Sequence, residues 1–348
     1  MKKSFLIIFL IGTFFTSFYA QKTTVNGFGH MDLIWEGHED HIDAYMSLGE
    51  HALFINSNIS ERISFLGEAT LKPSSSGFSV ALERAWLKYS FGKGFNVIVG
   101  KMHTPVNYWN DVYNHARLFF PTIDRPTSFS YLIPVHTLGL RFQGQNLGKY
   151  KFGYDLVLAN GMEASDTYAE GISPSYTAAF HFKPIDGMRV GASYHYENFS
   201  DASMIGSHAG HSHHSSGMNQ YKGELDFHVA SASIAHFGES FETLIEACYN
   251  ANNTDSLGRA DNFSLYTYLG KRIQEKHVPF INTDFISIDQ NDLHSHPLNK
   301  FKLAIGYRYE FTPLCNIKIM AGYYFGFNQL PNPAADKFQF KTQFSYGI

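Results

Sequence analysis

Apolar and polar residues alternate with a period of two along most of the chain after residue 21. In residues 299–312, every second side chain from Phe301 to Phe311 is apolar, and the intervening ones are Lys, Arg, Glu, Ala or Gly. This periodicity predicts β-strands with one apolar and one polar face. Sixteen such strands are predicted, over residues 23–35, 42–59, 63–72, 78–91, 95–103, 136–144, 150–160, 174–184, 188–198, 218–237, 241–251, 261–273, 278–289, 299–312, 317–328 and 337–348.

The predicted connections alternate between short and long along the chain. Even-numbered connections such as 92–94 and 238–240 are tight turns, whereas odd-numbered ones include 104–135, 161–173 and 199–217. Transmembrane barrels have an even strand number, short periplasmic turns and longer external loops. A soluble β-sandwich also alternates but gives no reason for this parity. We therefore predict an all-β fold, a transmembrane antiparallel β-barrel in the outer membrane of a Gram-negative bacterium, which loses its sheet edges by closure.

Both ends of the chain fit export to that membrane. Two lysines precede an apolar stretch over 5–15, and Ala20 suits cleavage, so residues 1–20 are predicted to be a signal peptide and 21–348 the barrel. The alternating apolar residues up to Ile348 resemble the C-terminal signature by which the barrel assembly machinery recognises its substrates, with Ile in place of the more usual Phe. This machinery and the lipid bilayer are the expected partners.

Composition narrows the function classes. Aromatic residues make up 16% and charged residues 17% of the chain, and the net charge is −4. The apolar content excludes disorder, and without a basic block we expect no nucleic-acid partner. The two cysteines, Cys248 in a predicted strand and Cys315 in a predicted turn, leave a disulfide open. No hydrolase, zinc-protease or phosphate-loop motif is present, so we expect neither enzymatic activity nor a resident cofactor.

The polar faces of the predicted strands would line the lumen, and barrels of 16 to 18 strands leave an aqueous channel. Alternation places Arg189, Glu197, Arg308 and Glu310 on these faces. Nine basic and nine acidic residues share this orientation, so no strong preference for either ion sign is predicted; alternatively, many of them pair across strands. These residues are Lys151, His181, Lys183, Arg189, Lys222, Arg272, Lys302, Arg308 and Lys318, and Glu68, Asp155, Glu197, Glu224, Asp226, Glu242, Glu246, Asp284 and Glu310.

Residues 100–140 carry the most distinctive stretches, which read G-K-M-H-T-P-V-N-Y-W-N, P-T-I-D-R-P and I-P-V-H-T-L-G-L. They resemble a group of uncharacterised, porin-like outer-membrane proteins of Gram-negative bacteria that carry related G-R-x-H-T, Y-W-N, D-R-P and L-P-V-H-T-V-G stretches. Residues 82–89 are also similar, whereas Lys101 replaces the Arg that this group tends to have. The resemblance implies a porin-like barrel and names no solute.

Residues 104–135 form the third predicted external loop. In general porins the corresponding loop folds inward and constricts the pore, and the resemblance implies the same role here. The alternative is that the loop packs on itself through its aromatic residues as a plug or cap. The candidate constriction residues are His103, His115, Asp124, Arg125 and His136.

A histidine-rich tract is the second candidate site, with ligands His208, His211, His213 and His214. Imidazole suits Zn, Cu and Ni, and His-rich tracts are typical of weak metal binding. The alternative is a solvated loop that titrates near a pKa of about 6.5. Two functions follow: a passive channel for small hydrophilic solutes or ions, or a plugged barrel that binds divalent metal or a partner through its His-rich external loops. A homo-oligomer stays open in both cases.

Overall fold

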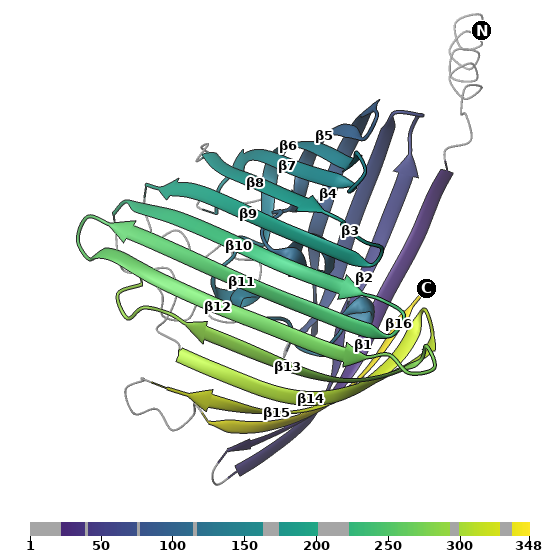
Figure 1. The fold of residues 1–348 in the computed structure, drawn as a ribbon, viewed down its shortest axis with the longest axis vertical. Coiled ribbons are helices and arrows are strands. Elements are labelled where there is room, and N and C mark those ends of the chain that lie inside the picture. Colours follow the sequence, from purple (N-terminus) through teal and green to yellow (C-terminus); the bar gives the residue numbers. More distant parts are fainter. Residues whose placement is uncertain are drawn as a thin grey trace, which may run out of the picture.

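The computed structural model describes residues 22–38, 41–74, 77–113, 117–162, 174–200, 223–292, 299–327 and 336–348. They form a closed antiparallel barrel in which β1 pairs with β16 (Figure 1), and the predicted count of sixteen strands is confirmed. The strands are β1 (Lys22–His38), β2 (His41–Asn58), β3 (Ile63–Ser74), β4 (Gly77–Gly92), β5 (Phe95–His103), β6 (His136–Leu147), β7 (Phe152–Asn160), β8 (Pro174–Phe182), β9 (Met188–Phe199), β10 (Leu225–Phe237), β11 (Phe241–Thr254), β12 (Gly258–Lys271), β13 (His277–Ser287), β14 (Asn299–Thr312), β15 (Cys315–Gly326) and β16 (Lys337–Gly347).

Some predicted boundaries are wrong. β10 begins at Leu225, although the alternation predicted a start at residue 218, and β12 begins three residues before its predicted start. Cys315, predicted in a turn, is the first residue of β15, where it pairs with Thr312 across a tight connection. Both cysteines are free, so the disulfide left open by the sequence does not form.

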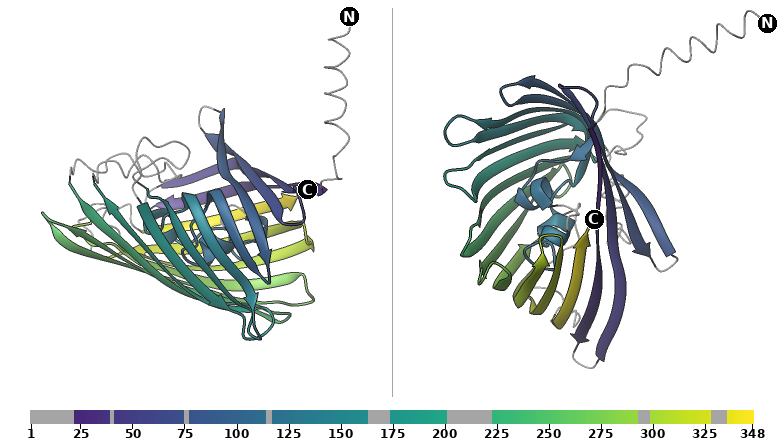
Figure 2. Two further views of the ribbon diagram at one scale, coloured as in Figure 1. Left: turned by 90° about the horizontal axis from the view of Figure 1, so that it is seen from above. Right: turned by 90° about the vertical axis from the view of Figure 1, so that its right-hand side faces the viewer.

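The two ends of the chain close the barrel at one rim. Gly27 and Ile348 donate backbone N–H groups to each other's carbonyl oxygens, at 3.1 and 2.8 Å. We call this rim the terminal end, and the opposite rim, where β5 leads into the long loop, the loop end (Figure 2). The even-numbered connections lie at the terminal end because each even-numbered strand returns there.

Side chains alternate between the two faces of the barrel wall as the sequence predicts. On β14, Ile305 is 62% exposed and faces outward, whereas Arg308 on the same strand faces inward and is 5% exposed. Tyr194 and Tyr307 also face outward. An apolar outer surface on a sheet without edges satisfies the backbone internally, as a bilayer requires. The outer surface of the barrel is therefore suited to contact with lipid.

The segment between β5 and β6 holds the helical turns, which lie within the ring of strands (Figure 2). They are a π-helical turn η1 (Trp109–Tyr113), a 3₁₀ turn η2 (Arg117–Phe119) and a one-turn helix α2 (Ser128–Tyr131). Among the described residues, no helix has the length and apolarity needed to cross a membrane. We call residues 104–135 the inserted loop.

Candidate functional site

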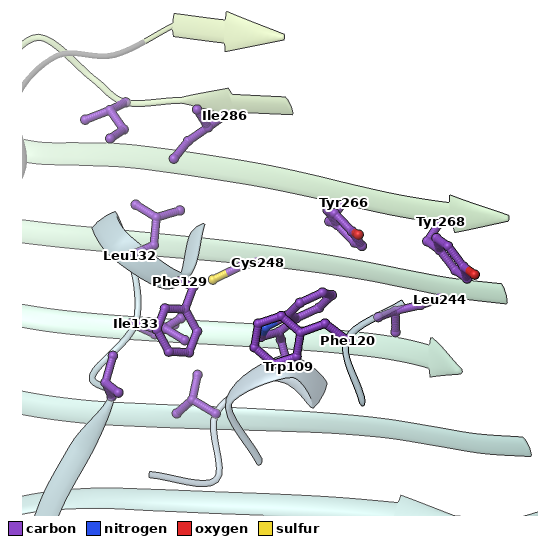
Figure 3. Packing of buried hydrophobic residues seen from close by; sticks show 14 of the residues in the cluster. Trp109, Phe120, Phe129, Leu132, Ile133, Leu244, Cys248, Tyr266, Tyr268 and Ile286 are labelled. Atoms are coloured by element: carbon purple, nitrogen blue, oxygen red, sulfur yellow. The ribbon is translucent and has the colours of Figure 1, made fainter. Parts of the chain in front are cut away.

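The apolar side of the inserted loop packs on the inner wall of β10–β13 (Figure 3). The side chain of Trp109 is fully buried. Its ring centroid lies 5.0 Å from that of Phe120 and 5.4 Å from that of Tyr266 of β12. Phe129 and Leu132 belong to the same buried cluster as wall residues Leu244 and Cys248. Burying a large aromatic side chain stabilises by about 2 kcal/mol. The loop therefore shares a hydrophobic core with this half of the wall.

Asparagines shape the first turn of the inserted loop and tie its two ends together. Asn107 has a left-handed backbone (φ 55°), and its Oδ1 accepts a hydrogen bond from the Asn110 N–H at 2.9 Å. Asn110 is fully buried and donates its amide to the carbonyl oxygens of Thr104 at 2.8 Å and Val135 at 3.1 Å. Asparagine tolerates this conformation better than most residues. The two asparagines of the N-Y-W-N stretch thus hold the two ends of the inserted loop together.

Two buried wall carboxylates accept hydrogen bonds from backbone N–H groups where the loop turns begin. Glu246 of β11 accepts from the backbone N–H groups of Tyr108 and Trp109, at 2.6 and 3.0 Å. Asp284 of β13 accepts from both the N–H and the hydroxyl of Thr127, each at 2.7 Å. The first N–H groups of a helical turn have no partner within the turn, and a carboxylate satisfies them. These bonds fix the loop to the wall at two places.

Asp124 and Arg125, two candidate constriction residues, contact the part of the wall that runs from β14 through β16 and β1 to β2. Asp124 pairs with Lys302 of β14 at 2.5 Å and with Lys341 of β16 at 2.6 Å. Burial alone would raise the pKa of Asp124, but the two ammonium groups outweigh it and hold the pKa well below the usual range. Arg125 pairs with Glu50 of β2 at 3.2 Å, and burial lowers its pKa to about 10.

His103 and His136, the other described candidates, lie side by side where the loop leaves and rejoins the wall. Their ring centroids are 5.2 Å apart. His103 lies 4.0 Å from a carboxylate oxygen of Glu68, and His136 lies 3.1 Å from one of Glu83. The four described candidates thus form two pairs, Asp124 with Arg125 and His103 with His136, and His115 lies outside the described residues.

The four named lumen residues fall into three environments. Arg308 binds both carboxylate oxygens of Glu242, at 2.8 and 2.9 Å, and also donates to the Pro121 carbonyl of the loop at 3.2 Å. Glu310 joins this network through Arg308, at 2.9 Å. Glu197 is completely buried and lies 3.6 Å from His195, whereas Arg189 contacts the loop farther round the wall.

Two of the predicted inward residues lie elsewhere. Asp226 faces outward, because β10 starts at Leu225 with the odd-numbered residues inside, and it accepts hydrogen bonds from Tyr196 at 3.0 Å and Asn198 at 2.9 Å. Glu224 precedes β10 and is exposed. Lys222 lies outside the described residues.

The lumen keeps open space between the inserted loop and the wall formed by β4–β9. A hollow of about 580 Å³ lies against β6–β9, and a smaller one of about 190 Å³ lies against β4–β6. Asp111, Arg141 and Gln143 line both, so these side chains lie between the two hollows. We call the two hollows together the side passage.

Asp111 connects the inserted loop to the wall of the side passage. Its carboxylate lies 2.6 Å from Arg189 and 3.4 Å from Arg141. Burial would raise the pKa of Asp111, but the two guanidinium groups outweigh it and lower the pKa to about 2. Neither Asp111 nor Arg141 is among the residues that the sequence predicts for the site. Alternation could have found Arg141, because Thr137, Gly139, Arg141 and Gln143 form the polar face of the predicted strand 136–144.

A further hollow of about 1400 Å³ opens at the terminal end, between the loop and β10–β15. Leu118 and Phe119 of the loop and the network of Glu242, Arg272 and Glu310 line it. Within the described ranges, no group of three or more His, Cys, Asp or Glu side chains is placed to hold a metal ion. His208, His211, His213 and His214 lie outside those ranges.

A closed barrel with an apolar outer surface and a polar lumen has the architecture of outer-membrane β-barrel proteins. No protein-family model matches the sequence, and no curated protein sequence matches it either. Solved structures with a similar fold include an anion-selective porin from Comamonas acidovorans, with a TM-score of 0.66 and 8% identity over 94% of this chain and 100% of that one.

Two further similar structures come from other bacteria. The outer membrane channel DcaP of Acinetobacter baumannii gives a TM-score of 0.64 at 13% identity, over 96% of this chain and 99% of that one. The trimer form of OmpT, an outer membrane protein of Vibrio cholerae, gives 0.63 at 12% identity, over 94% and 99%. These likenesses concern the fold, and they confirm the porin-like barrel that the sequence resemblance implies.

Proposed function

We propose that the protein is an outer-membrane channel through which small hydrophilic solutes diffuse passively. One observation carries this proposal: the inserted loop packs against β10–β13, where a hollow opens at the terminal end, and leaves the side passage beside β4–β9. The passage is lined mainly by polar and charged side chains, which suit water and dissolved solutes.

The loop would set the narrowest point of this channel. Asp111 reaches from the loop to Arg141 and Arg189, so a solute has to pass beside this contact. Hydrogen bonds and ion pairs from β2, β9, β11, β13, β14 and β16 hold the loop, which favours a fixed constriction. The alternative of a plugged barrel differs in one respect, because it conducts no ions. A homo-oligomer is part of the proposal, since the similar OmpT structure is described as a trimer.

Single-channel recording of the refolded protein in a planar bilayer tests the proposal. We expect discrete, stable conductance steps, and a folded protein that gives none would contradict the channel function. Tyr108→Ala should raise the conductance, because Tyr108 lines the larger hollow of the side passage. Tyr150→Ala removes an exposed tyrosine at a terminal-end turn and serves as the control, with conductance expected at the wild-type level.

A further inference from the structure

Buried acids and accessible bases divide the charges along the side passage. Glu68 of β3 and Asp155 of β7 are each 1% exposed. Their basic partners cover them: Arg84 binds Glu68, and Arg141 binds Asp155 at 2.6 Å. The side chain of Arg84 is 24% exposed, compared with 1% for Glu68. Because charge exposed to water acts on a passing ion more directly than charge buried behind a counterion, the wall presents a positive surface.

The charges that line the passage are unequal in number. Six are basic and two are acidic, and adding the two buried acids, Glu68 and Asp155, still leaves 6 − 4 = 2 positive charges in excess. Arg84, Lys88, Arg141, Lys151, Lys183 and Arg189 are the bases, and Asp111 and Asp186 are the acids. Lys151 and Asp186 lie at the terminal end, where their side chains are 54% and 99% exposed.

The hollow on the other side of the loop has the opposite sign. It is lined by five acids and two arginines, an excess of 5 − 2 = 3 negative charges. These are Asp186, Glu239, Glu242, Glu275 and Glu310, and Arg272 and Arg308. The inserted loop thus lies between a hollow with an excess of basic lining residues and one with an excess of acidic lining residues, and Asp186 at the terminal end lines both.

We propose that the side passage favours small anions over cations. The inference rests on the channel function proposed above and names its solute class. Arg141 and Arg189 converge on the Asp111 carboxylate, so the passage already binds an oxyanion of the loop at its narrowest place. Guanidinium groups recognise carboxylate and phosphate through charge-assisted hydrogen bonds. Lys151 and Lys183 then form a basic entrance on the terminal side.

Reversal potentials across a KCl gradient test this inference on the intact protein. We expect chloride to be more permeant than potassium in the wild type. In the double variant Lys151→Gln/Lys183→Gln the chloride-to-potassium permeability ratio should fall. Each charge removed should lower the local concentration of chloride and raise that of potassium by about threefold each, the effect of a unit charge at roughly 6 Å in water. Lys276→Gln, at the exposed turn between β12 and β13 and outside the side passage, should leave the ratio unchanged.

The outcomes separate the two proposals. A folded protein without conductance contradicts the channel function, whereas a conducting protein that prefers potassium overturns only the anion preference. An unchanged ratio in a conducting Lys151→Gln/Lys183→Gln variant also overturns it, because conductance itself shows that the variant is folded. Asp111→Asn provides the opposite test: removing this acid should raise the chloride-to-potassium ratio, and a fall would refute the assignment.

Discussion

Removing the Glu246 carboxylate should release the first turn of the inserted loop from the wall. Glu246 accepts two backbone hydrogen bonds from the loop, at 2.6 and 3.0 Å, and is 2% exposed. Glu246→Ala leaves the N–H groups of Tyr108 and Trp109 without this acceptor in a buried site. A buried donor that loses its acceptor costs about 1–3 kcal/mol, so the loss of both hydrogen bonds costs about 2–6 kcal/mol.

The loss of these two hydrogen bonds should raise the population of molecules in which the first turn of the loop is open. A change of about 3 kcal/mol corresponds to about a 100-fold rise in the open population, at 1.4 kcal/mol per tenfold. Hydrogen exchange followed by mass spectrometry in detergent measures it, in peptides that cover residues 104–113. Glu246→Gln should give a smaller increase, because one acceptor oxygen remains for the two N–H groups.

The control is Glu239→Ala, which removes an exposed glutamate at the turn between β10 and β11 and should leave exchange in residues 104–113 unchanged. Peptides from β14 should exchange as in the wild type in all variants, because their backbone bonds belong to the barrel. If exchange of the loop peptide in Glu246→Ala stays within threefold of the wild type, the carboxylate does not anchor the loop and the reasoning fails.

Three further predictions concern pH, metal and orientation. The lysine partners of Asp124 keep its folded pKa below the unfolded value of about 3.9, so the stability that these ion pairs contribute is present above about pH 4 and is lost below it. The thermal midpoint should therefore fall below pH 4, and it should fall by less in Asp124→Asn than in the wild type. Deleting residues 208–214 should abolish micromolar-range Zn or Cu binding in calorimetry without affecting folding. Ile305→Cys should resist a water-soluble thiol reagent and Lys183→Cys should react, and the reverse pattern would contradict the orientation of the wall.

The fold follows from the sequence because alternation directly records lipid on one face and water on the other. β5 and β14 match their predicted bounds, and the strand count is confirmed. Errors occur where this contrast is weak. Outward Asp226 and His228 make the start of β10 polar on the lipid side, with hydrogen bonds to Tyr196 and Tyr194 in place of apolar contacts. Alternation alone could not locate that end.

The site was less predictable, because its contacts join distant parts of the chain. The length of the connection and its distinctive stretches singled out residues 104–135. Nothing local indicates that Asp124 pairs with Lys302 and Lys341, which are 178 and 217 residues away. Those partners depend on strand order around the barrel and on the depth that the loop reaches. A candidate set chosen by residue type therefore included Asp124 but omitted Asp111 of η1, which is likewise a loop carboxylate held by two basic wall residues.

The number of basic and acidic lumen residues does not predict the ion preference of the side passage. A count of nine basic and nine acidic residues weighs each group equally, although a passing ion responds to position and solvent exposure. Asp155 is 1% exposed behind Arg141, whereas the side chain of Lys151 is 54% exposed. Which member of a pair covers the other depends on side-chain length, because arginine and lysine extend beyond a carboxylate anchored to the wall. Equal numbers of basic and acidic residues in the sequence can therefore give a passage with a positive surface. The ion selectivity then depends on which member of each wall ion pair is exposed, and not on the composition.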